Sequence, residues 1–252
     1  MSSGTPKTYF ISGASRSLGL GYARTLLATQ TGSRIIAGVR NPANASQLHA
    51  LAAEPANKDR IHVVPWDVDD ESKVKETATK LAQEDDWVRS AGIDAVIVNA
   101  GVFEGGHKPP SQLSIENLRD NFCTNVEGAI HTVQHLLPLL KQGNAKQIFF
   151  ISSICGSMQG FYSETAAGVT YSMSKAAVNM LGIKYARELA DEGFTVVLLH
   201  PGYVKSDMNK FDGGGNITVE EAVTKATKNV FLAAKPEWNG KFVDYEGETV
   251  PW

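Results

Sequence analysis

Residues 8–21 read TYFISGASRSLGLG, a short run rich in apolar residues that leads directly into a glycine-rich turn and then a helical pattern. A glycine-rich turn between a strand and a helix lets backbone N–H groups and the helix N-terminus face a pyrophosphate. The spaced-glycine pattern GxGxxG is not met, and a turn of small residues can also serve tight packing alone. Because this is the first strand-to-helix turn of the chain, its position favours a nucleotide site.

Further short apolar runs alternate with longer helical patterns, at residues 34–39, 61–65, 93–99, 147–152, 195–200 and 241–243. Strands that are apolar along their whole length are typical of a parallel sheet covered on both faces. Alternation of strands and helices indicates a doubly wound sheet with right-handed crossovers. No linker, repeat or low-complexity segment divides the chain. The sequence therefore predicts one α/β domain over residues 1–252, a Rossmann fold with a doubly wound, seven-stranded parallel sheet and helices on both faces.

The composition excludes several classes of protein. The chain has 252 residues, 42% of them hydrophobic, with 24 Lys or Arg and 27 Asp or Glu. No segment concentrates basic charge, so nucleic acid is not an expected partner. No apolar run approaches the roughly 18 residues of a membrane span, and the first residues lack the layout of a signal peptide. Cys123 and Cys155 form no CxxC motif, so we expect no disulfide framework and a cytoplasmic protein without a membrane partner.

The residue after the second expected strand bears on the choice of nicotinamide cofactor. A site for NAD usually has an acid there that binds the ribose 2′-hydroxyl, whereas this chain has Arg40. Arg40 and Arg16 of the glycine-rich turn together form a pair of guanidinium groups suited to a 2′-phosphate. Either arginine can equally be a solvated surface residue. The sequence favours NADP(H), that is NADPH/NADP⁺, as the cofactor.

Small and polar residues follow the other strands at their carboxyl ends, where open α/β sheets bind ligands. An aspartate at such a place can also cap a helix, and a serine can merely cap a turn. The positions are Asp67-Val68, Asn99-Ala100-Gly101, Ser152-Ser153 and Pro201-Gly202.

Two histidines form the only pattern that suggests a metal. His131 and His135 share a face of an expected helix. No third ligand and no glutamate accompany them, so no metal site is expected.

Residues 166–189 read AAGVTYSMSKAAVNMLGIKYAREL, which predicts a helix with Tyr171 and Lys175 on one face. A phenol is a poor acid near neutrality because its ordinary pKa is about 10. A cation held beside the phenol favours the phenolate and so lowers that pKa. The pair is a candidate proton donor, although a lone Tyr-x-x-x-Lys is more often part of an ordinary amphipathic helix.

Over essentially the whole chain the sequence resembles the short-chain dehydrogenase/reductase family. Each motif is weak alone, but the ordered set is specific. It consists of the turn at residues 13–19, Asp67, Asn99-Ala100-Gly101, Ser153 with Tyr171-x-x-x-Lys175, and Pro201-Gly202. The stretch at residues 242–247 reads Phe-x-Asp-Tyr-x-Gly and is similar to the ending of small carbonyl-reductase-like members.

The resemblance implies that a hydride passes between a nicotinamide and a carbonyl or alcohol carbon. Tyr171 would be the general acid in reduction and the base in oxidation. Ser153 would hydrogen-bond the substrate oxygen, where negative charge develops. Lys175 would bind the nicotinamide ribose and lower the pKa of Tyr171. Asn125, on the expected helix after the fourth strand, would position a water that links Lys175 to solvent.

The resemblance also implies the cofactor contacts. Asp67 and Val68 would contact the adenine, and Asn99 would brace the strand and cofactor framework. Ser17 stands where the family usually has glycine and Ser206 where threonine is commoner; both hydroxyls are compatible with binding. The full expected set is Gly13, Ser15, Arg16, Ser17, Leu18, Gly19, Arg40, Asp67, Val68, Asn99, Ala100, Gly101, Tyr171, Lys175, Pro201, Gly202, Val204 and Ser206.

The expected substrate pocket is apolar and aromatic. Such a lining suits a bulky apolar or aromatic ketone or aldehyde, although some of the side chains can belong to the core. The segment between Ser153 and Tyr171 is longer than in typical members and is expected to reshape this pocket. The candidate lining residues are Val102, Phe103, Met158, Phe161, Tyr162, Tyr203, Met208 and Phe211.

The favoured activity is NADPH-dependent reduction of a ketone or aldehyde to an alcohol. One alternative is an alcohol dehydrogenase that works in the oxidative direction. Another is a non-catalytic NADP(H)-binding redox sensor, but such proteins have generally lost the tyrosine or the lysine. The helices around residues 125–140 and 171–189 are those that relatives use to pair subunits, so a homo-oligomer, a dimer or tetramer, is expected.

Overall fold

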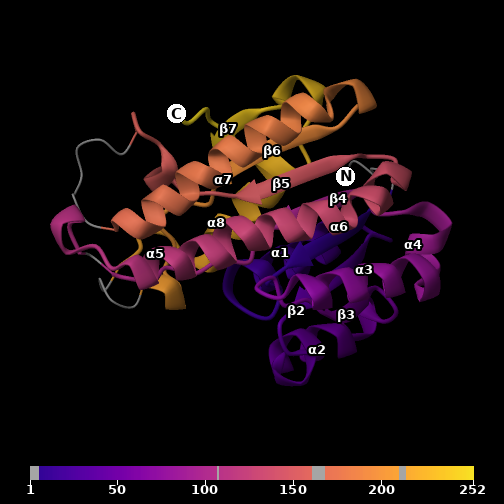
Figure 1. Ribbon diagram of the computed structural model, residues 1–252. Helices are drawn as coiled ribbons and strands as arrows, with labels where there is room; N and C mark the ends of the chain where they lie inside the picture. The colour runs from indigo at the N-terminus through magenta and orange to yellow at the C-terminus, as the bar shows by residue number, and fades with distance from the viewer. Residues whose placement is uncertain (1–5, 107, 161–167, 210–213) are drawn as a thin grey trace.

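The computed structural model describes residues 6–106, 108–160, 168–209 and 214–252. Seven parallel strands form one sheet in the order β3-β2-β1-β4-β5-β6-β7 (Figure 1). The strands are β1 (Thr8–Ser12), β2 (Arg34–Val39), β3 (Ile61–Pro65), β4 (Ala95–Val98), β5 (Gln147–Ile151), β6 (Thr195–His200) and β7 (Lys241–Asp244). The predicted single-domain, seven-stranded parallel Rossmann sheet is therefore confirmed.

Successive side chains of the central strands enter two separate apolar clusters. Phe10 and Phe150 pack on one face of the sheet, and Ile11 and Phe149 pack on the other. All four side chains are fully buried. Because a strand alternates its side chains between the two faces, burial of both faces requires apolar residues at every position. This explains why the strands are uninterrupted apolar runs in the sequence.

Helices cover both faces of the sheet. The core residues of α3, α4, α6 and α7 lie in the first cluster, and those of α1, α2 and α8 in the second, so the two helix groups sandwich the sheet (Figure 1). The α-helices are α1 (Ser17–Thr29), α2 (Ser46–Ala53), α3 (Glu71–Glu84), α4 (Asp86–Ala91), α5 (Ile115–Phe122), α6 (Gly128–Gln142), α7 (Val169–Glu188) and α8 (Val219–Ala226). None of the described helices is long and apolar enough to cross a membrane.

Short 3₁₀ and π turns complete the described secondary structure. The 3₁₀ turns are η1 (Pro42–Asn44), η2 (Pro55–Asn57), η3 (Pro110–Gln112), η5 (Ile154–Gly156), η6 (Ala190–Glu192), η7 (Asp207–Asn209) and η9 (Pro236–Trp238). The π turns are η4 (Cys123–Glu127), between α5 and α6, and η8 (Thr227–Phe231), after α8. The sequence predicted an ordinary helix around Asn125, and the structure corrects this to the π turn η4.

The site is positioned by the carboxyl ends of four adjacent strands. β1 ends at Ser12, β4 at Val98, β5 at Ile151 and β6 at His200, and these strands are neighbours in the sheet in that order. Parallel strands end at the same edge, so the segments that follow them meet there. The predicted motifs after the strands therefore converge on one edge of the sheet.

Candidate active site

Tyr171 and Lys175 lie on one face of α7, as their four-residue spacing requires. The Lys175 ammonium is 5.6 Å from the centre of the Tyr171 ring. It donates a hydrogen bond of 2.8 Å to the carbonyl oxygen of Ile151, the last residue of β5. Only 5% of Lys175 is exposed, so α7 brings a buried cation to the sheet edge, close to the phenol.

Ser153, in the segment that directly follows β5, lies beside the Tyr171 phenol. It caps the 3₁₀ turn η5, where its Oγ accepts a hydrogen bond of 3.2 Å from the backbone N–H of Cys155. Its side chain also hydrogen-bonds Tyr171. Gly156 closes this turn against α7, because a Cβ there would lie 2.7 Å from the carbonyl carbon of Lys175. The turn can approach α7 closely only with glycine at this position.

Burial sets the protonation of this pair. It raises the pKa of Tyr171 above its ordinary value, an effect that the Cys155 thiol reinforces and the hydrogen bond from Ser153 opposes. Burial also lowers the pKa of Lys175 to about 8. The pKa of Tyr171 is thus shifted upward rather than downward, with burial as the largest cause, and the role of Lys175 in lowering it stays a prediction. Tyr171 stays a protonated phenol at neutral pH, which is the form that a general acid needs.

Asn125 connects α7 to the segment after β4. Its Oδ1 accepts from the backbone N–H of Val102 at 2.8 Å, and its Nδ2 donates to the Val102 carbonyl at 3.0 Å and to Ser174 Oγ at 2.9 Å. Both amide hydrogens are thus used by protein groups. A Cβ on Gly101 would lie 3.1 Å from Asn125 Oδ1 and 3.6 Å from Lys175 Nζ. The role of Asn125 in positioning a water stays a prediction.

The glycine-rich turn fits a pyrophosphate. Gly13 has a φ of +68°, and a Cβ on Gly19 would lie 2.3 Å from the Gly13 carbonyl oxygen. No side chain caps the N-terminus of α1, whose N-cap is Arg16, and an uncapped helix N-terminus is suited to bind an anion. Ser17 has a φ of +47°, a left-handed conformation that explains why glycine is usual there. The Ser15 and Leu18 side chains are both partly buried in this turn.

Asn99 braces this turn from β4. Its Nδ2 donates to the carbonyl oxygens of Ser12 at 3.0 Å and Gly13 at 3.2 Å. Ser12 Oγ accepts in return from the backbone N–H groups of Asn99 and Ala100. These bonds join the first turn to the segment after β4 at the sheet edge.

Charged residues gather where the sequence predicts the adenosine end of the cofactor. Arg40 is exposed and contacts Asp67 at 3.5 Å and Asp69 at 3.3 Å. Asp67 Oδ1 is buried and has no hydrogen-bond partner among the described residues, since its contact with Arg40 Nε is too long for a hydrogen bond. A buried acceptor of this kind suits the exocyclic amine of adenine. The Val68 side chain instead packs on Gly128 in the core, so only its backbone is available to an adenine.

The two histidines considered as a metal site have other partners. His131 Nδ1 lies 3.0 Å from the Val68 carbonyl oxygen, and His135 Nε2 lies 3.1 Å from Glu71 Oε1. Within the described part of the chain, no three potential ligands gather at one place.

The loop after β6 is fixed by glycine and by a short bridge. Gly202, after the buried Pro201, has a φ of +89°, and a Cβ there would lie 2.4 Å from Ile217 Cδ1. Val204 pairs with Ile217 in an isolated parallel bridge. Ser206 follows, partly buried. The loop is therefore held on the same sheet edge as Ser153.

The substrate side is more exposed than the core. Phe103 packs edge-on against the Tyr171 ring, with ring centres 5.1 Å apart. Three further expected lining residues are exposed, Met158 by 81%, Tyr203 by 44% and Met208 by 37%, and Val102 is partly buried. The described lining candidates therefore do not belong to the core. Phe161, Tyr162 and Phe211 lie outside the described residues.

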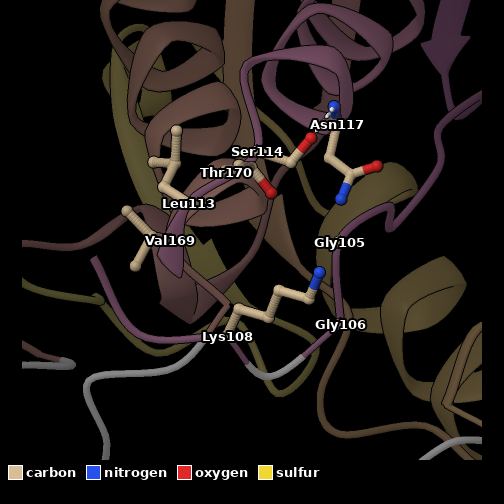
Figure 2. Close-up of a pocket in the computed structure, with 8 residues that line it drawn as sticks. All are labelled: Gly105, Gly106, Lys108, Leu113, Ser114, Asn117, Val169 and Thr170. Carbon is tan, nitrogen blue, oxygen red and sulfur yellow. Dashed lines mark hydrogen bonds between the residues drawn. The ribbon is translucent and has the colours of Figure 1, made fainter. Parts of the chain in front are cut away.

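A small pocket adjoins this region but is not the substrate site. It leaves a cavity of about 10 Å³, about the least that one water requires. Figure 2 shows the Lys108 ammonium pointing toward the Asn117 amide across it. The pocket is lined by Gly105, Gly106, Lys108, Leu113, Ser114, Asn117, Val169 and Thr170. A bulky carbonyl compound does not fit in this volume.

Protonation of His200, the last residue of β6, makes the stability of the folded protein depend on pH. Its Nδ1 accepts from the backbone N–H of Ile154 at 3.2 Å, and burial lowers the pKa of His200 to about 4 from 6.5. The imidazole of His200 binds a proton more readily in the unfolded chain than when buried. The stabilisation by the neutral, buried imidazole is therefore complete above pH 6.5 and is lost as the pH falls toward 4. We expect His200 to account for a loss of about 2 kcal/mol between pH 7 and pH 5.

Urea unfolding of the wild type and of His200→Asn at both pH values measures this loss. The asparagine keeps an acceptor for Ile154 but cannot titrate, so its stability should fall by about 2 kcal/mol less. An equal fall in both proteins would contradict the assignment.

Comparison with known proteins identifies the family to which this chain belongs. The family model for short chain dehydrogenase matches residues 7–214 of this chain. The chain belongs to the short-chain dehydrogenase family. An uncharacterised oxidoreductase of Schizosaccharomyces pombe is 33% identical over 264 residues, covering 98% of this chain and 99% of the relative. The chain is therefore an oxidoreductase of the short-chain dehydrogenase family.

Solved structures of carbonyl reductases are similar to this short-chain dehydrogenase. The NADPH-bound carbonyl reductase from chicken fatty liver is 28% identical with a TM-score of 0.86, covering 98% of this chain and 99% of that chain. The carbonyl reductase Sniffer of D. melanogaster is 26% identical with a TM-score of 0.87, covering 98% and 100%. The resemblance to carbonyl-reductase-like members is therefore confirmed.

Sequence reasoning missed several residues of this site. Cys155 and Ser174 contact the catalytic candidates, and Asp69 pairs with Arg40. Ser174 directly precedes Lys175, yet nothing in the local sequence shows that it meets Asn125, which is 49 residues away. Asp69 could have been predicted from the sequence, because it lies two residues after Asp67 in the segment that follows the third strand.

Proposed function

We propose that this short-chain dehydrogenase uses NADPH to reduce a bulky apolar or aromatic ketone or aldehyde to an alcohol. The observation that carries the proposal is the meeting of Ser153, Tyr171 and Lys175 at the sheet edge, with the Phe103 ring against Tyr171. A hydroxyl donor and a protonated phenol beside an apolar wall suit a carbonyl oxygen that gains negative charge.

The residues divide the work of the reaction. NADPH, when bound, supplies the hydride that adds to the carbonyl carbon. Tyr171 gives its phenol proton to the carbonyl oxygen, so the carbonyl gains one hydride and one proton and becomes an alcohol. Ser153 donates a hydrogen bond to the same oxygen while its charge develops. Lys175 keeps positive charge close to the phenolate that remains, which favours that anion once it forms.

The cofactor assignment rests on the residues that would hold it. The pyrophosphate would lie against the turn around Gly13 and Gly19, at the uncapped N-terminus of α1. Asp67 would accept from the adenine amine through Oδ1, which has no hydrogen-bond partner among the described residues. Arg40, which is exposed and pairs with Asp67 and Asp69, would bind the 2′-phosphate together with Arg16. The similarity to the NADPH-bound carbonyl reductase from chicken fatty liver supports the same choice.

The setting in the cell and the assembly stay predictions. We propose a cytoplasmic protein, since both cysteines are free thiols, as is usual in a reducing compartment. We also propose a homo-oligomer, a dimer or tetramer, because α7 exposes Met173 by 44% and Met180 by 59% on one face. A monomeric mass by light scattering would contradict the second proposal.

The proposed activity is tested by following NADPH absorbance with a panel of aryl ketones, quinones and aldehydes. We expect consumption that depends on the carbonyl compound and that is slower with NADH. Tight binding of NADPH without consumption across the panel would instead favour a sensor.

A further inference from the structure

Two buried residues that take no part in the proposed reaction join the end of β5 to α7. Ser152 Oγ donates to Asn179 Oδ1 at 2.5 Å, and Asn179 Nδ2 donates to the Gly156 carbonyl at 3.2 Å. Ser152 is 1% exposed and Asn179 is 4% exposed. Ser152 directly precedes Ser153, so the pair acts on the backbone that carries the reactive hydroxyl.

The orientation of the Asn179 amide is fixed by its partners. A carbonyl oxygen can only accept, so Nδ2 must face Gly156 and Oδ1 must face the hydroxyl of Ser152. The amide therefore bridges the two ends of a short segment, from residue 152 to residue 156. Loss of this side chain would leave a buried hydroxyl and a buried carbonyl without these bonds.

Asn179 continues the face of α7 that holds the reactive groups. It follows Lys175 by four residues, just as Lys175 follows Tyr171, so all three side chains leave one side of the helix. Lys175 binds the Ile151 carbonyl at 2.8 Å. The end of β5 is thus tied to α7 at residues 151, 152 and 156, on both sides of Ser153.

We propose that Ser152 and Asn179 are positioning residues that hold the Ser153 hydroxyl at hydrogen-bonding distance from Tyr171. The inference rests on the proposed function, because it gives the two residues a role in the reduction. From the α7 side, Lys175 holds the Ile151 carbonyl and Asn179 holds residues 152 and 156. The hydrogen bond of Ile154 runs instead to His200 on β6. A misplacement of about 1 Å at a reacting group can cost up to about 100-fold in rate.

Three variants test the proposal in the full-length chain. Asn179→Leu removes both bonds at similar side-chain volume, and Ser152→Ala is a milder change that removes one. The matched control is Thr132→Val on α6, which removes the buried hydrogen bond of 3.1 Å that Trp66 Nε1 donates to Thr132 Oγ1. The measurements are kcat and KM with NADPH and a carbonyl substrate, the Kd of NADPH by fluorescence, the melting temperature, and hydrogen exchange of the peptide at residues 152–157.

We expect kcat to fall about 10-fold or more in Asn179→Leu and less in Ser152→Ala. The Kd of NADPH should stay within about 2-fold, and exchange at residues 152–157 should become faster. Thr132→Val should lose melting temperature to a similar extent but keep both kcat and this exchange rate. A merely structural role of Asn179 would give the control and the test variants the same kinetics.

Two results would overturn the proposal. One is a kcat in folded Asn179→Leu and Ser152→Ala that falls no more than in Thr132→Val. The other is exchange at residues 152–157 that stays at the wild-type rate, which can be read even if the wild type turns over no carbonyl compound. Absence of turnover in the wild type with faster exchange in the variants would contradict the proposed function and leave the tie between β5 and α7 established.

Discussion

Replacement of Tyr171 by phenylalanine is expected to lower kcat about 1,000-fold while the Kd of NADPH changes little. The phenol is the only proton donor that the proposed reaction uses, and general acid catalysis contributes about 10²- to 10⁴-fold. Phenylalanine keeps the ring that packs on Phe103 at 5.1 Å, so the pocket wall should remain. The loss is measured as the rate of NADPH consumption at saturating substrate.

The matched control for this variant is Tyr22→Phe. The Tyr22 hydroxyl is buried and has no hydrogen-bond partner among the described residues, and it lies in α1, away from Ser153. Its removal should leave kcat unchanged and the fold intact. A Tyr171→Phe enzyme with more than about a tenth of wild-type kcat would mean that another group supplies the proton.

Replacement of Arg40 by alanine is expected to weaken the preference for NADPH over NADH. A lost charge-assisted hydrogen bond is worth about 1.5–3 kcal/mol, or about 10- to 100-fold in affinity. We therefore expect the Kd of NADPH to rise by that factor and the Kd of NADH, which has no 2′-phosphate, to stay within about 2-fold. Fluorescence titration of both cofactors measures the two constants.

Arg24→Ala provides the control for charge. Arg24 is another exposed arginine in an ion pair, at 3.3 Å from Glu54, and its loss should change neither constant. An Arg40→Ala protein that still binds NADPH as the wild type does would show that Arg40 only pairs with Asp67 and Asp69. NADP(H) selectivity would then need another explanation.

The fold could be predicted from the sequence because each strand is marked by a local run of apolar residues. The central strands are buried on both faces, so their apolar runs report their positions within a residue or two. Only β4 is clearly shorter than its run at residues 93–99, since it spans Ala95–Val98. Ile93 instead bonds the carbonyl of Leu139, and Asp94 accepts from backbone N–H groups through its side chain.

The site was readable only in part. The four-residue spacing of Tyr171 and Lys175 on a helix is a local feature, and the sheet edge then brings Ser153 to them. The π turn at Asn125 has no such signal, because the Val102 backbone that engages it is 23 residues away. The direction of the pKa shift of Tyr171 depends on how deeply the fold buries it, and a sequence does not give that depth.

The conformation of the glycine-rich turn shows the same limit. A small residue at position 17 was expected to be tolerated, and the structure places Ser17 at a φ of +47°. The reason glycine is usual there is a backbone angle, which becomes visible only in three dimensions.

The most direct test of the account follows the hydride itself. NADPH that carries deuterium at the transferred position of the nicotinamide is incubated with the protein and an aryl ketone, and the alcohol is analysed by mass spectrometry and NMR. The account predicts one deuterium at the carbinol carbon, and almost no alcohol from the Tyr171→Phe variant in the same time. Bound NADPH that is not consumed, or an alcohol without deuterium at that carbon, would contradict it.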